Sequence, residues 1–416
     1  MLFSSDAPAA AILNRFTQFG VELGLERIKR LLNTLGNPHQ QVPIIHVAGS
    51  NGKGSTCAFL SSVLTAAGYR VGRYTSPHLV SWCERISLNG QDISPAELHH
   101  LLLNVIDAID PNYSSPTQFE VITAVAWLYF AQQQVDLAVV EVGLGGRLDA
   151  TNVCDRPLVS IITSLSREHW QRLGSTLAEI SYEKAGVLKP HCPAVIAPQP
   201  AEAEAVLKTR LVELDCPVIW VDPKVSRSYS LALPGEHQLI NAALAIATFH
   251  ILQKQGWKIS EDHIIQGLAT TEWKGRLQWT QWRNHNLLID GAHNPAGAKM
   301  LRRYVDNQDV DDQATRSINW VMGMLTNKDH EDVFRELLRT GDRLYLVPVP
   351  EHLPTDMDEL AQIAQTACPG LAHCAVYPDV IKGLEAAFEI NSAGQNSTTV
   401  LCGSLYLIGH FLSISP

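Results

Sequence analysis

The stretch that most constrains the fold is residues 44–56, where an apolar run passes into a glycine-rich segment that carries a lysine and then hydroxyl side chains. The run at 44–48 is short and rich in β-branched residues, and the segment at 55–67 has helical length, so the order strand, loop, helix is predicted. In such a loop, backbone N–H groups of residues 49–54 can point at phosphate oxygens, and Lys53 can reach the outer phosphates. The spacing Gly-x-x-Gly-Lys-Gly-Ser is shorter than the common phosphate-loop pattern. We therefore predict a variant nucleotide-binding loop, with a purely structural glycine turn as the alternative.

Length and composition limit the classes of protein that remain. A chain of 416 residues is too long for one ordinary core, so two or three domains are expected. The net charge of −10 argues against nucleic acid as the main partner, and no apolar run is long enough to predict a membrane span. The eight cysteines lack the spacing of a metal site or a disulfide framework, which indicates reduced, buried thiols. We expect a cytoplasmic monomer that binds neither nucleic acid nor membrane.

A second signal, acidic and glycine-rich, occupies residues 137–152. An apolar strand ends there at Glu141, and Val-Gly-Leu-Gly-Gly-Arg-Leu-Asp-Ala-Thr-Asn follows. Ligands gather at the carboxyl ends of parallel strands, where an acidic side chain can meet the metal of a bound nucleotide. Glu141 is therefore predicted to be a Mg2+ ligand. A separate α/β unit is expected after residues 283–286, with its own strands near 319–323, 344–347, 374–377 and 399–402.

These motifs resemble the folate branch of the Mur ligase superfamily. The resemblance rests on residues 47–55, on Ser-Pro-His-Leu at 76–79, on the segment at 141–152 and on Asp-Gly-Ala-His-Asn-Pro at 290–295. It implies an α/β protein in which residues 1–284 form an N-terminal P-loop-type ATPase domain that has a mainly parallel sheet and binds ATP and folate. Residues 285–416 would form a smaller, Rossmann-like C-terminal ligase domain. The chain departs from the family pattern at Glu168 and Asn327, where the family usually has aspartate.

The resemblance also implies roles for individual residues. ATP contacts are expected at Ser50, Asn51, Gly52, Lys53, Gly54, Ser55, Asn241, Arg276, Asp290 and His293. Folate contacts are expected at Glu22, Leu23, Gly24, Thr117, Gln118, Phe119, Glu120, Leu148, Asp149 and Ala150. Metal ligands are expected at Ser76, Glu141 and His169, and catalytic roles at Lys53, His169, Lys184 and Arg276.

Several of these assignments have structural alternatives. The segment at 22–24 could be an ordinary connection between helices, and Ser76 could be part of a common turn before Pro77. Thr117 followed by Glu120 also satisfies the capping-box pattern of a helix start. His169 could be an ordinary hydrogen-bonded histidine, because histidine is an unusual ligand for a cation as hard as Mg2+. Lys184, which the resemblance implies is carbamylated, could instead be a solvated helix lysine. Carbamylation needs the neutral amine, so this interpretation requires a site that lowers the pKa of Lys184.

The implied reaction is an ATP-dependent ligation. The resemblance implies transfer of the ATP γ-phosphoryl group to a carboxylate of dihydropteroate or a reduced folate, and attack by the amino group of L-glutamate on the acyl phosphate. ATP would be a co-substrate and two Mg2+ ions would be cofactors, and the chain would have dihydrofolate synthase activity, folylpolyglutamate synthase activity or both. Another amino-acid ligase of the Mur type and a nucleotide switch without ligase activity are the alternatives.

Overall fold

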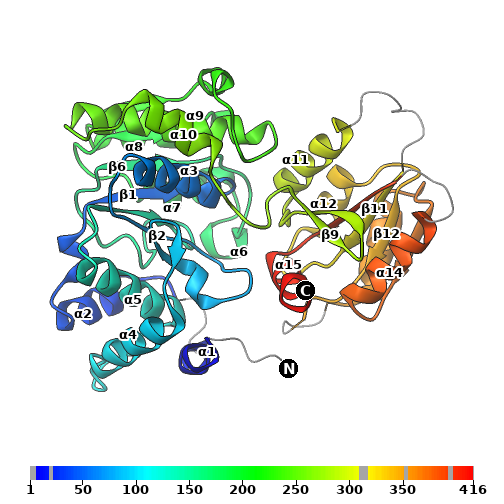
Figure 1. Ribbon diagram of the computed structural model, residues 1–416, viewed down its shortest axis with the longest axis horizontal. Coiled ribbons are helices and arrows are strands. Elements are labelled where there is room, and N and C mark those ends of the chain that lie inside the picture. The colour runs from blue at the N-terminus through cyan, green and yellow to red at the C-terminus, as the bar shows by residue number, and fades with distance from the viewer. Residues whose placement is uncertain (1–5, 18–21, 309–316, 351–354, 392–396, 416) are drawn as a thin grey trace. The chain divides into compact units, whose positions relative to one another are not determined.

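The computed structural model describes residues 6–17, 22–308, 317–350, 355–391 and 397–415, and within them the chain forms two compact units. The first unit comprises residues 1–232 and 237–272, and the second comprises residues 233–236 and 273–416. Each unit has its own sheet covered by helices (Figure 1). The α/β fold class with two domains is therefore confirmed.

The sheet of the first unit has the strand order β4-β3-β2-β5-β1-β6-β7-β8. All neighbouring strands from β2 to β8 are parallel, and only β3 and β4 join antiparallel at one edge. The strands are β1 Ile44–Ala48, β2 Val71–Tyr74, β3 Ile86–Leu88, β4 Gln91–Asp92, β5 Leu137–Glu141, β6 Val159–Ile162, β7 Ala194–Ile196 and β8 Val218–Trp220. Every residue of β1 and β5 is buried, as expected for parallel strands that are covered on both faces.

Helices cover both faces of this sheet. Helices α3, α9 and α10 pack together on one side, and α2, α4 and α5 pack on the other (Figure 1). The helices are α1 Ala7–Asn14, α2 Glu26–Thr34, α3 Lys53–Ala66, α4 Pro95–Asp107, α5 Gln118–Gln132, α6 Trp170–Leu173, α7 Leu177–Ala185, α8 Ala201–Glu213, α9 His237–Lys254 and α10 Glu261–Ala269. Three short 3-10 helices are η2 Pro38–Gln41, η3 Trp82–Arg85 and η4 Pro223–Ser228.

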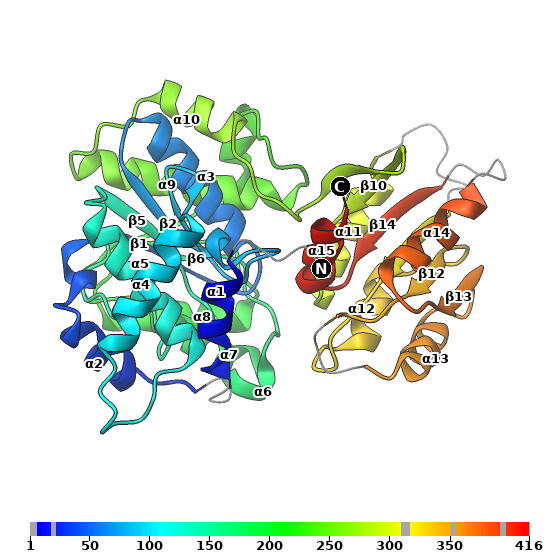
Figure 2. The same ribbon diagram turned by 60° about the horizontal axis from the view of Figure 1, so that its bottom comes forward.

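The second unit has the strand order β13-β12-β11-β14-β10-β9, with all pairs parallel except β9 and β10. Its strands are β9 Gln278–Trp282, β10 His285–Ile289, β11 Ile318–Met322, β12 Arg343–Leu346, β13 His373–Val376 and β14 Thr398–Cys402. Its helices are α11 Pro295–Asp306, α12 His330–Leu337, α13 Met357–Ala367, α14 Val380–Asn391 and α15 Leu405–Ile414. Figure 2 shows α12 and α13 on one side of this sheet and α14 on the other.

The units divide between Glu272 and Trp273, earlier than the boundary at residues 284 and 285 that the sequence predicted. The reason is the hairpin of β9 and β10, whose strands pair antiparallel from His285 opposite Trp282 to Ile289 opposite Gln278. A boundary at residue 284 would cut this hairpin at its turn. Residues 273–284 therefore belong to the second unit.

Over the described part of the chain, none of the helices has the length and apolar character needed to cross a membrane.

Candidate active site

Helix α3 begins directly after the glycine loop and presents an open N-terminus. Its N-cap is Gly52, with a φ of 91° that a side-chain-bearing residue rarely adopts, and within the described chain no side chain caps this helix end. The first N–H groups of a helix have no partner inside the helix, and here they belong to residues 53–55. This end of α3 therefore has the free donors and the positive potential that bind phosphate.

The rest of the loop is held by the segment after β6. The N–H groups of Ser50 and Asn51 both donate to the carbonyl of Ser164, at 3.0 and 3.3 Å. The hydroxyl of Ser50 donates to the carbonyl of Ser166 and accepts from its N–H, both at 3.0 Å. The expectation that these two loop N–H groups point at phosphate is therefore wrong, because the neighbouring segment already uses them. These hydrogen bonds fix the shape of the loop.

Two lysines meet at one carbonyl of this loop. Lys53 Nζ lies 3.1 Å from the carbonyl oxygens of Gly49 and Ser50, and Lys184 Nζ lies 2.7 Å from the same Gly49 oxygen. Lys184, in the last turn of α7, is only 3% exposed. Burial, and then the nearby charge of Lys53, lower the pKa of Lys184 to about 7. The alternative of a solvated helix lysine is therefore wrong.

The start of α9 lies against the same loop. A Cβ atom on Gly52 would lie 2.3 Å from Oδ1 of Asn241, so the loop and this side chain are in close contact. Asn241 donates to Gln238 at 2.8 Å, and Gln238 donates to the hydroxyl of Ser55 at 3.3 Å. Gln238 was not among the site residues predicted from the sequence. Its spacing of three residues before Asn241 on a helix places both side chains on one face, and that spacing could have revealed it.

Ser76 and Glu141 come together at the carboxyl ends of neighbouring strands. Strands β2 and β5 pair in parallel, and the N–H of Ser76 donates to Oε2 of Glu141 at 3.1 Å. A carboxylate and a hydroxyl are oxygen ligands of the kind that Mg2+ prefers, and Mg2+ commonly takes only one or two protein ligands and completes its shell with water and phosphate. These two residues therefore fit a Mg2+ ion next to the phosphate loop.

His169 occupies a different setting. It has a φ of 52°, precedes α6 and has Nε2 3.7 Å from Oε1 of Glu168. The described residues include no group of three or more His, Cys, Asp and Glu side chains that could hold a metal ion. The structure thus brings Ser76 and Glu141 together, and the metal role of His169 stays a prediction.

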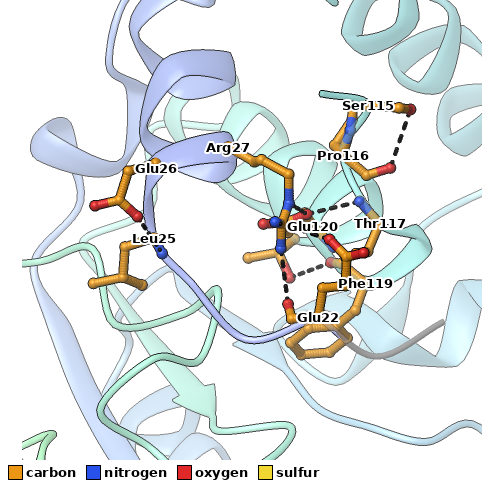
Figure 3. A network of polar contacts seen from close by, with 10 residues as sticks. Glu22, Leu25, Glu26, Arg27, Ser115, Pro116, Thr117, Phe119 and Glu120 are labelled. Carbon is orange, nitrogen blue, oxygen red and sulfur yellow. Dashed lines mark hydrogen bonds and ion pairs between the residues drawn. The ribbon is translucent and has the colours of Figure 1, made fainter. Parts of the chain in front are cut away.

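The three segments predicted to contact folate lie side by side. The N–H of Gly24 donates to the carbonyl of Leu148 at 3.3 Å. Phe119 packs directly against Gly143, where a Cβ atom would lie 2.4 Å from the ring. Glu22 and Glu120 are joined by the guanidinium of Arg27, which was not among the predicted site residues (Figure 3). Segments at 22–24, 117–120 and 143–150 therefore form one assembly.

Within this assembly, two of the three predicted carboxylates, Glu120 and Asp149, are buried and act on their own segments, whereas the side chain of Glu22 is 58% exposed. Glu120 is 2% exposed, and together with Thr117 it forms the capping box of α5, as the sequence pattern allowed. Asp149 is 3% exposed and accepts from the N–H of Leu144 at 2.8 Å and from the N–H and hydroxyl of Thr151 at 3.0 and 2.6 Å. Burial raises the pKa of Asp149. Both carboxylates shape the segments that carry the other predicted contacts.

Gln118, another predicted folate contact, donates to the carbonyl of Leu13 at 3.2 Å.

The predicted residues of the second unit also gather at one place. Asp290 follows β10 and accepts from the N–H groups of Leu277 and Ala292, each at 2.8 Å. Arg276 packs against Gly291, where a Cβ atom would lie 2.4 Å from Nη1. Nδ1 of His293 lies 2.7 Å from the carbonyl of Gly291. Asp290 thus joins the segment of Arg276 to that of His293, and all three lie at the carboxyl end of β10.

Comparison with known proteins agrees with this arrangement. Residues 47–219 match the Mur ligase middle domain, and residues 274–414 match the C-terminal domain of dihydrofolate synthetase. The dihydrofolate synthase/folylpolyglutamate synthase of Bacillus subtilis is 33% identical, over 98% of each chain. The dihydrofolate synthetase of Saccharomyces cerevisiae is 33% identical, over 95% of this chain and 98% of its own.

Solved structures give the same result. Mycobacterium tuberculosis folylpolyglutamate synthase, complexed with ADP and AMPPCP, superposes with a TM-score of 0.86 at 28% identity and covers 99% of each chain. E. coli FolC in complex with DHPP and ADP superposes with a TM-score of 0.80 at 26% identity, over 99% of this chain and 98% of that one. The chain therefore belongs to the dihydrofolate synthase/folylpolyglutamate synthase family, the folate branch of the Mur ligases.

Proposed function

We propose that this chain is an ATP-dependent ligase that joins L-glutamate to the carboxylate of dihydropteroate or of a reduced folate. The observation that carries the proposal is the meeting of Lys53 and Lys184 at the Gly49 carbonyl, beside the open N-terminus of α3. Relatives bound to ADP, AMPPCP or DHPP support a nucleotide and a pteroate as ligands. The first unit would bind ATP and folate, and the second would contribute Arg276, Asp290 and His293.

The residues of the phosphate loop have distinct tasks in this reaction. The N–H groups of residues 53–55 would bind phosphate oxygens, and the Lys53 ammonium would turn from the loop carbonyls to the transferred group. The γ-phosphoryl group passes to the folate carboxylate, which gives an acyl phosphate and ADP. The neutral amino group of glutamate then attacks the acyl carbon, phosphate leaves, and the amine loses a proton to give the amide.

Ser76 and Glu141 would hold Mg2+, which when bound supplies positive charge to the phosphates. Glu141 is buried to 4% exposure, so its charge acts in a setting with little water and is worth more than it would be at the surface. A second Mg2+ near His169 is also part of the proposal. It rests on the family resemblance and on the position of His169 after β6, at the carboxyl edge of the sheet.

The buried amine of Lys184 is suited to carbamylation. A pKa of about 7 leaves a large neutral fraction at neutral pH, and the neutral amine is the form that adds carbon dioxide. A carbamate would replace a positive charge beside Lys53 with a negative one. The electrostatic repulsion between the two lysines would then become attraction.

The Bacillus relative bears the names of both activities, which supports a bifunctional enzyme. We also propose that the enzyme works as a monomer in the cytoplasm, and the eight free cysteines support a reducing compartment.

A phosphate-release assay tests the proposed function. Purified protein, ATP and Mg2+ are combined with glutamate and with either dihydropteroate or tetrahydrofolate, and each substrate is left out in turn. Phosphate release that requires both glutamate and a pteroate compound supports the proposal, and release in the absence of both indicates a nucleotide switch. Dependence on a different acceptor indicates another Mur-type ligase. Lys53→Ala serves as the inactive control, because the lysine contributes charge to the phosphate site.

A further inference from the structure

Arg27 joins the N-terminal loop to the start of α5 through three separate contacts. Its Nε donates to Oε2 of Glu120 at 3.0 Å, its Nη1 lies 3.0 Å from Oε2 of Glu22, and its Nη2 donates to the carbonyl oxygen of Glu22 at 2.8 Å (Figure 3). Its side chain is 16% exposed, whereas that of Glu120 is 3% exposed. One half-buried cation therefore connects two segments that are far apart in the sequence.

The two segments are those that carry predicted folate contacts. Glu22 directly precedes Leu23 and Gly24, and Gly24 is bonded to the carbonyl of Leu148. On the other side, Oε2 of Glu120 also accepts from the N–H of Thr117 at 2.7 Å, which fixes the first turn of α5. The contacts of Arg27 therefore set the distance between the loop at 22–24 and the first turn of α5.

Burial makes this connection important for Glu120. Its other oxygen, Oε1, is buried and has no hydrogen-bond partner among the described residues. All of the observed compensation for the carboxylate thus comes from Arg27 and the Thr117 N–H, both at Oε2. A buried carboxylate is costly without a cation or several donors. Glu120 therefore depends on Arg27, and the same Arg27 also holds the loop that carries Glu22.

The three contacts also require arginine. Its planar guanidinium can donate in three directions at once, here to a buried carboxylate, an exposed carboxylate and a backbone carbonyl. A lysine ammonium at the same place keeps the charge, but it is a single point that cannot reach all three acceptors. The site thus requires the planar shape and several donors of arginine, and a positive charge alone does not satisfy it.

We propose that Arg27 is a positioning residue that sets the geometry of the folate site by holding the loop at 22–24 against the first turn of α5. This inference rests on the proposed function. Among the described residues, no hydrogen bond or ion pair joins Arg27 to the phosphate loop or to the predicted Mg2+ ligands. Its effect is therefore on the acceptor substrate, and the ATP site keeps its wild-type properties.

The test is Arg27→Lys, which preserves the charge beside Glu120. The apparent KM for dihydropteroate is expected to rise roughly tenfold or more, because a small misplacement of positioning residues has effects of this size. The KM for ATP and the affinity for ADP stay within about twofold of the wild type, since the ATP site is unaltered. The matched control is Arg210→Lys, because Arg210 also pairs with a glutamate, Glu213 at 3.0 Å, but on the exposed surface of α8. This control is expected to leave every constant unchanged.

A second variant separates positioning from the cost of a buried charge. In Arg27→Met with Glu120→Gln, the buried pair becomes neutral and of similar size, while the tie to Glu22 is lost. Its KM is compared with that of Glu120→Gln alone, because Glu120 is itself a predicted folate contact and part of the capping box of α5. A raised KM for dihydropteroate with wild-type ADP affinity in this double variant supports positioning. A wild-type KM in both variants overturns the proposal, and so does a parallel loss of ADP affinity and thermal stability, which indicates a general folding role.

The proposed function is tested separately in the same experiment. If the wild-type protein shows no phosphate release that depends on dihydropteroate and glutamate, the function and the inference fail together. If the wild type does so and both variants have an unchanged KM for dihydropteroate, only the inference fails.

Discussion

At the scale of single residues, Lys184 and Lys53 share one acceptor, the carbonyl oxygen of Gly49. Two ammonium groups at such a short separation repel each other, and the burial of Lys184 removes the water that would screen them. The low pKa of Lys184 follows from this arrangement, because losing its proton relieves both the repulsion and the desolvation cost. The residues next to Lys184 in the sequence do not reveal that it is buried or that it lies near Lys53.

The first prediction at this scale is that Lys184→Ala lowers turnover by roughly 100-fold or more, as removal of a preorganised charged group commonly does. Added acetate or formate should restore part of the activity, because a small carboxylate can occupy the place of the carbamate. The measurement is the steady-state rate at saturating ATP, glutamate and Mg2+. Lys208→Ala is the control, since Lys208 is 62% exposed and pairs with Glu204 on α8. Full activity of Lys184→Ala would refute a catalytic role.

The second prediction concerns Glu141, whose Oε2 accepts from the Ser76 N–H. Glu141→Gln keeps the size and an oxygen at this position but removes the negative charge that Mg2+ requires. The Mg2+ concentration for half-maximal rate should rise roughly tenfold or more, with the maximal rate partly recovered at high Mg2+. The measurement is a Mg2+ titration at fixed ATP, with the exposed Glu213→Gln as the control. Identical titration curves for Glu141→Gln and the wild type would contradict the metal assignment.

At the scale of elements, α3 depends on contacts at its N-terminus that its own sequence does not contain. The loop before it is held by Ser164 and Ser166 after β6, and its first turn is reached by Gln238 from α9. These contacts come from strands and helices that are adjacent in space because β1 lies between β5 and β6. The phosphate site thus depends on α3, on α9 and on the segment after β6 together.

The prediction at this scale compares two glycines at opposite ends of α3. Gly52 has a φ of 91°, and an added Cβ atom would lie 2.3 Å from Oδ1 of Asn241, whereas Gly68 has a φ of 86° and open space around it. Both Gly→Ala changes should cost about 1 kcal/mol of stability through left-handed backbone strain. Only Gly52→Ala should also weaken ADP binding, by roughly tenfold, because the loop or Asn241 must move.

Calorimetric titration with ADP and thermal unfolding of both variants provide the measurements. Equal ADP affinity in Gly52→Ala and Gly68→Ala would show that the contact of the loop with α9 does not affect the nucleotide.

At the scale of the whole molecule, each unit has its own sheet and core, and each presents predicted residues at the carboxyl ends of its parallel strands. A buried chain of hydrogen bonds supports this edge in the first unit. His46 in β1 lies 2.9 Å from the hydroxyl of Thr151, and that hydroxyl donates to Asp149 at 2.6 Å. Because the Thr151 hydrogen is directed at Asp149, Nε2 of His46 is the donor to Thr151. Burial lowers the pKa of His46 to about 3.

The prediction at this scale is a loss of stability in acid. Below pH 6.5 the His46 side chain is protonated in the unfolded chain. In the folded protein the same side chain stays neutral down to about pH 3. The free energy of unfolding is therefore fully retained above pH 6.5 and falls as the pH drops towards 3, by up to about 1.4 kcal/mol per pH unit for this group.

His46→Gln keeps a donor for Thr151 but cannot titrate, so its unfolding free energy should fall less steeply over this range. Urea unfolding at a series of pH values measures both slopes. The pKa of His78 is also about 3, because of burial and the nearby charge of Arg85. His78 is present in the wild type and in His46→Gln, so it contributes the same pH dependence to the unfolding free energy of both proteins. Equal slopes for His46→Gln and the wild type would exclude His46 as a cause.

Short-range patterns in the sequence determined a large part of this protein. The strand, loop and helix around Lys53, the capping box of α5, and Glu141 at the end of β5 were all predicted, because each depends on residues within a few positions of one another. Four of the six strands of the second unit, β11 to β14, were predicted within a residue or two for the same reason, whereas β9 was not predicted.

The tertiary structure alone decided which groups meet and which are buried. Arg27 and Glu120 are 93 residues apart in sequence, and Lys184 and Gly49 are 135 apart, so their pairing depends on the order of strands in the sheet. The same holds for the Ser164 carbonyl, which takes up loop N–H groups that the sequence assigned to phosphate. Burial is the physical reason, because a side chain's pKa and its available partners depend on everything packed around it, and adjacent residues supply only part of that packing.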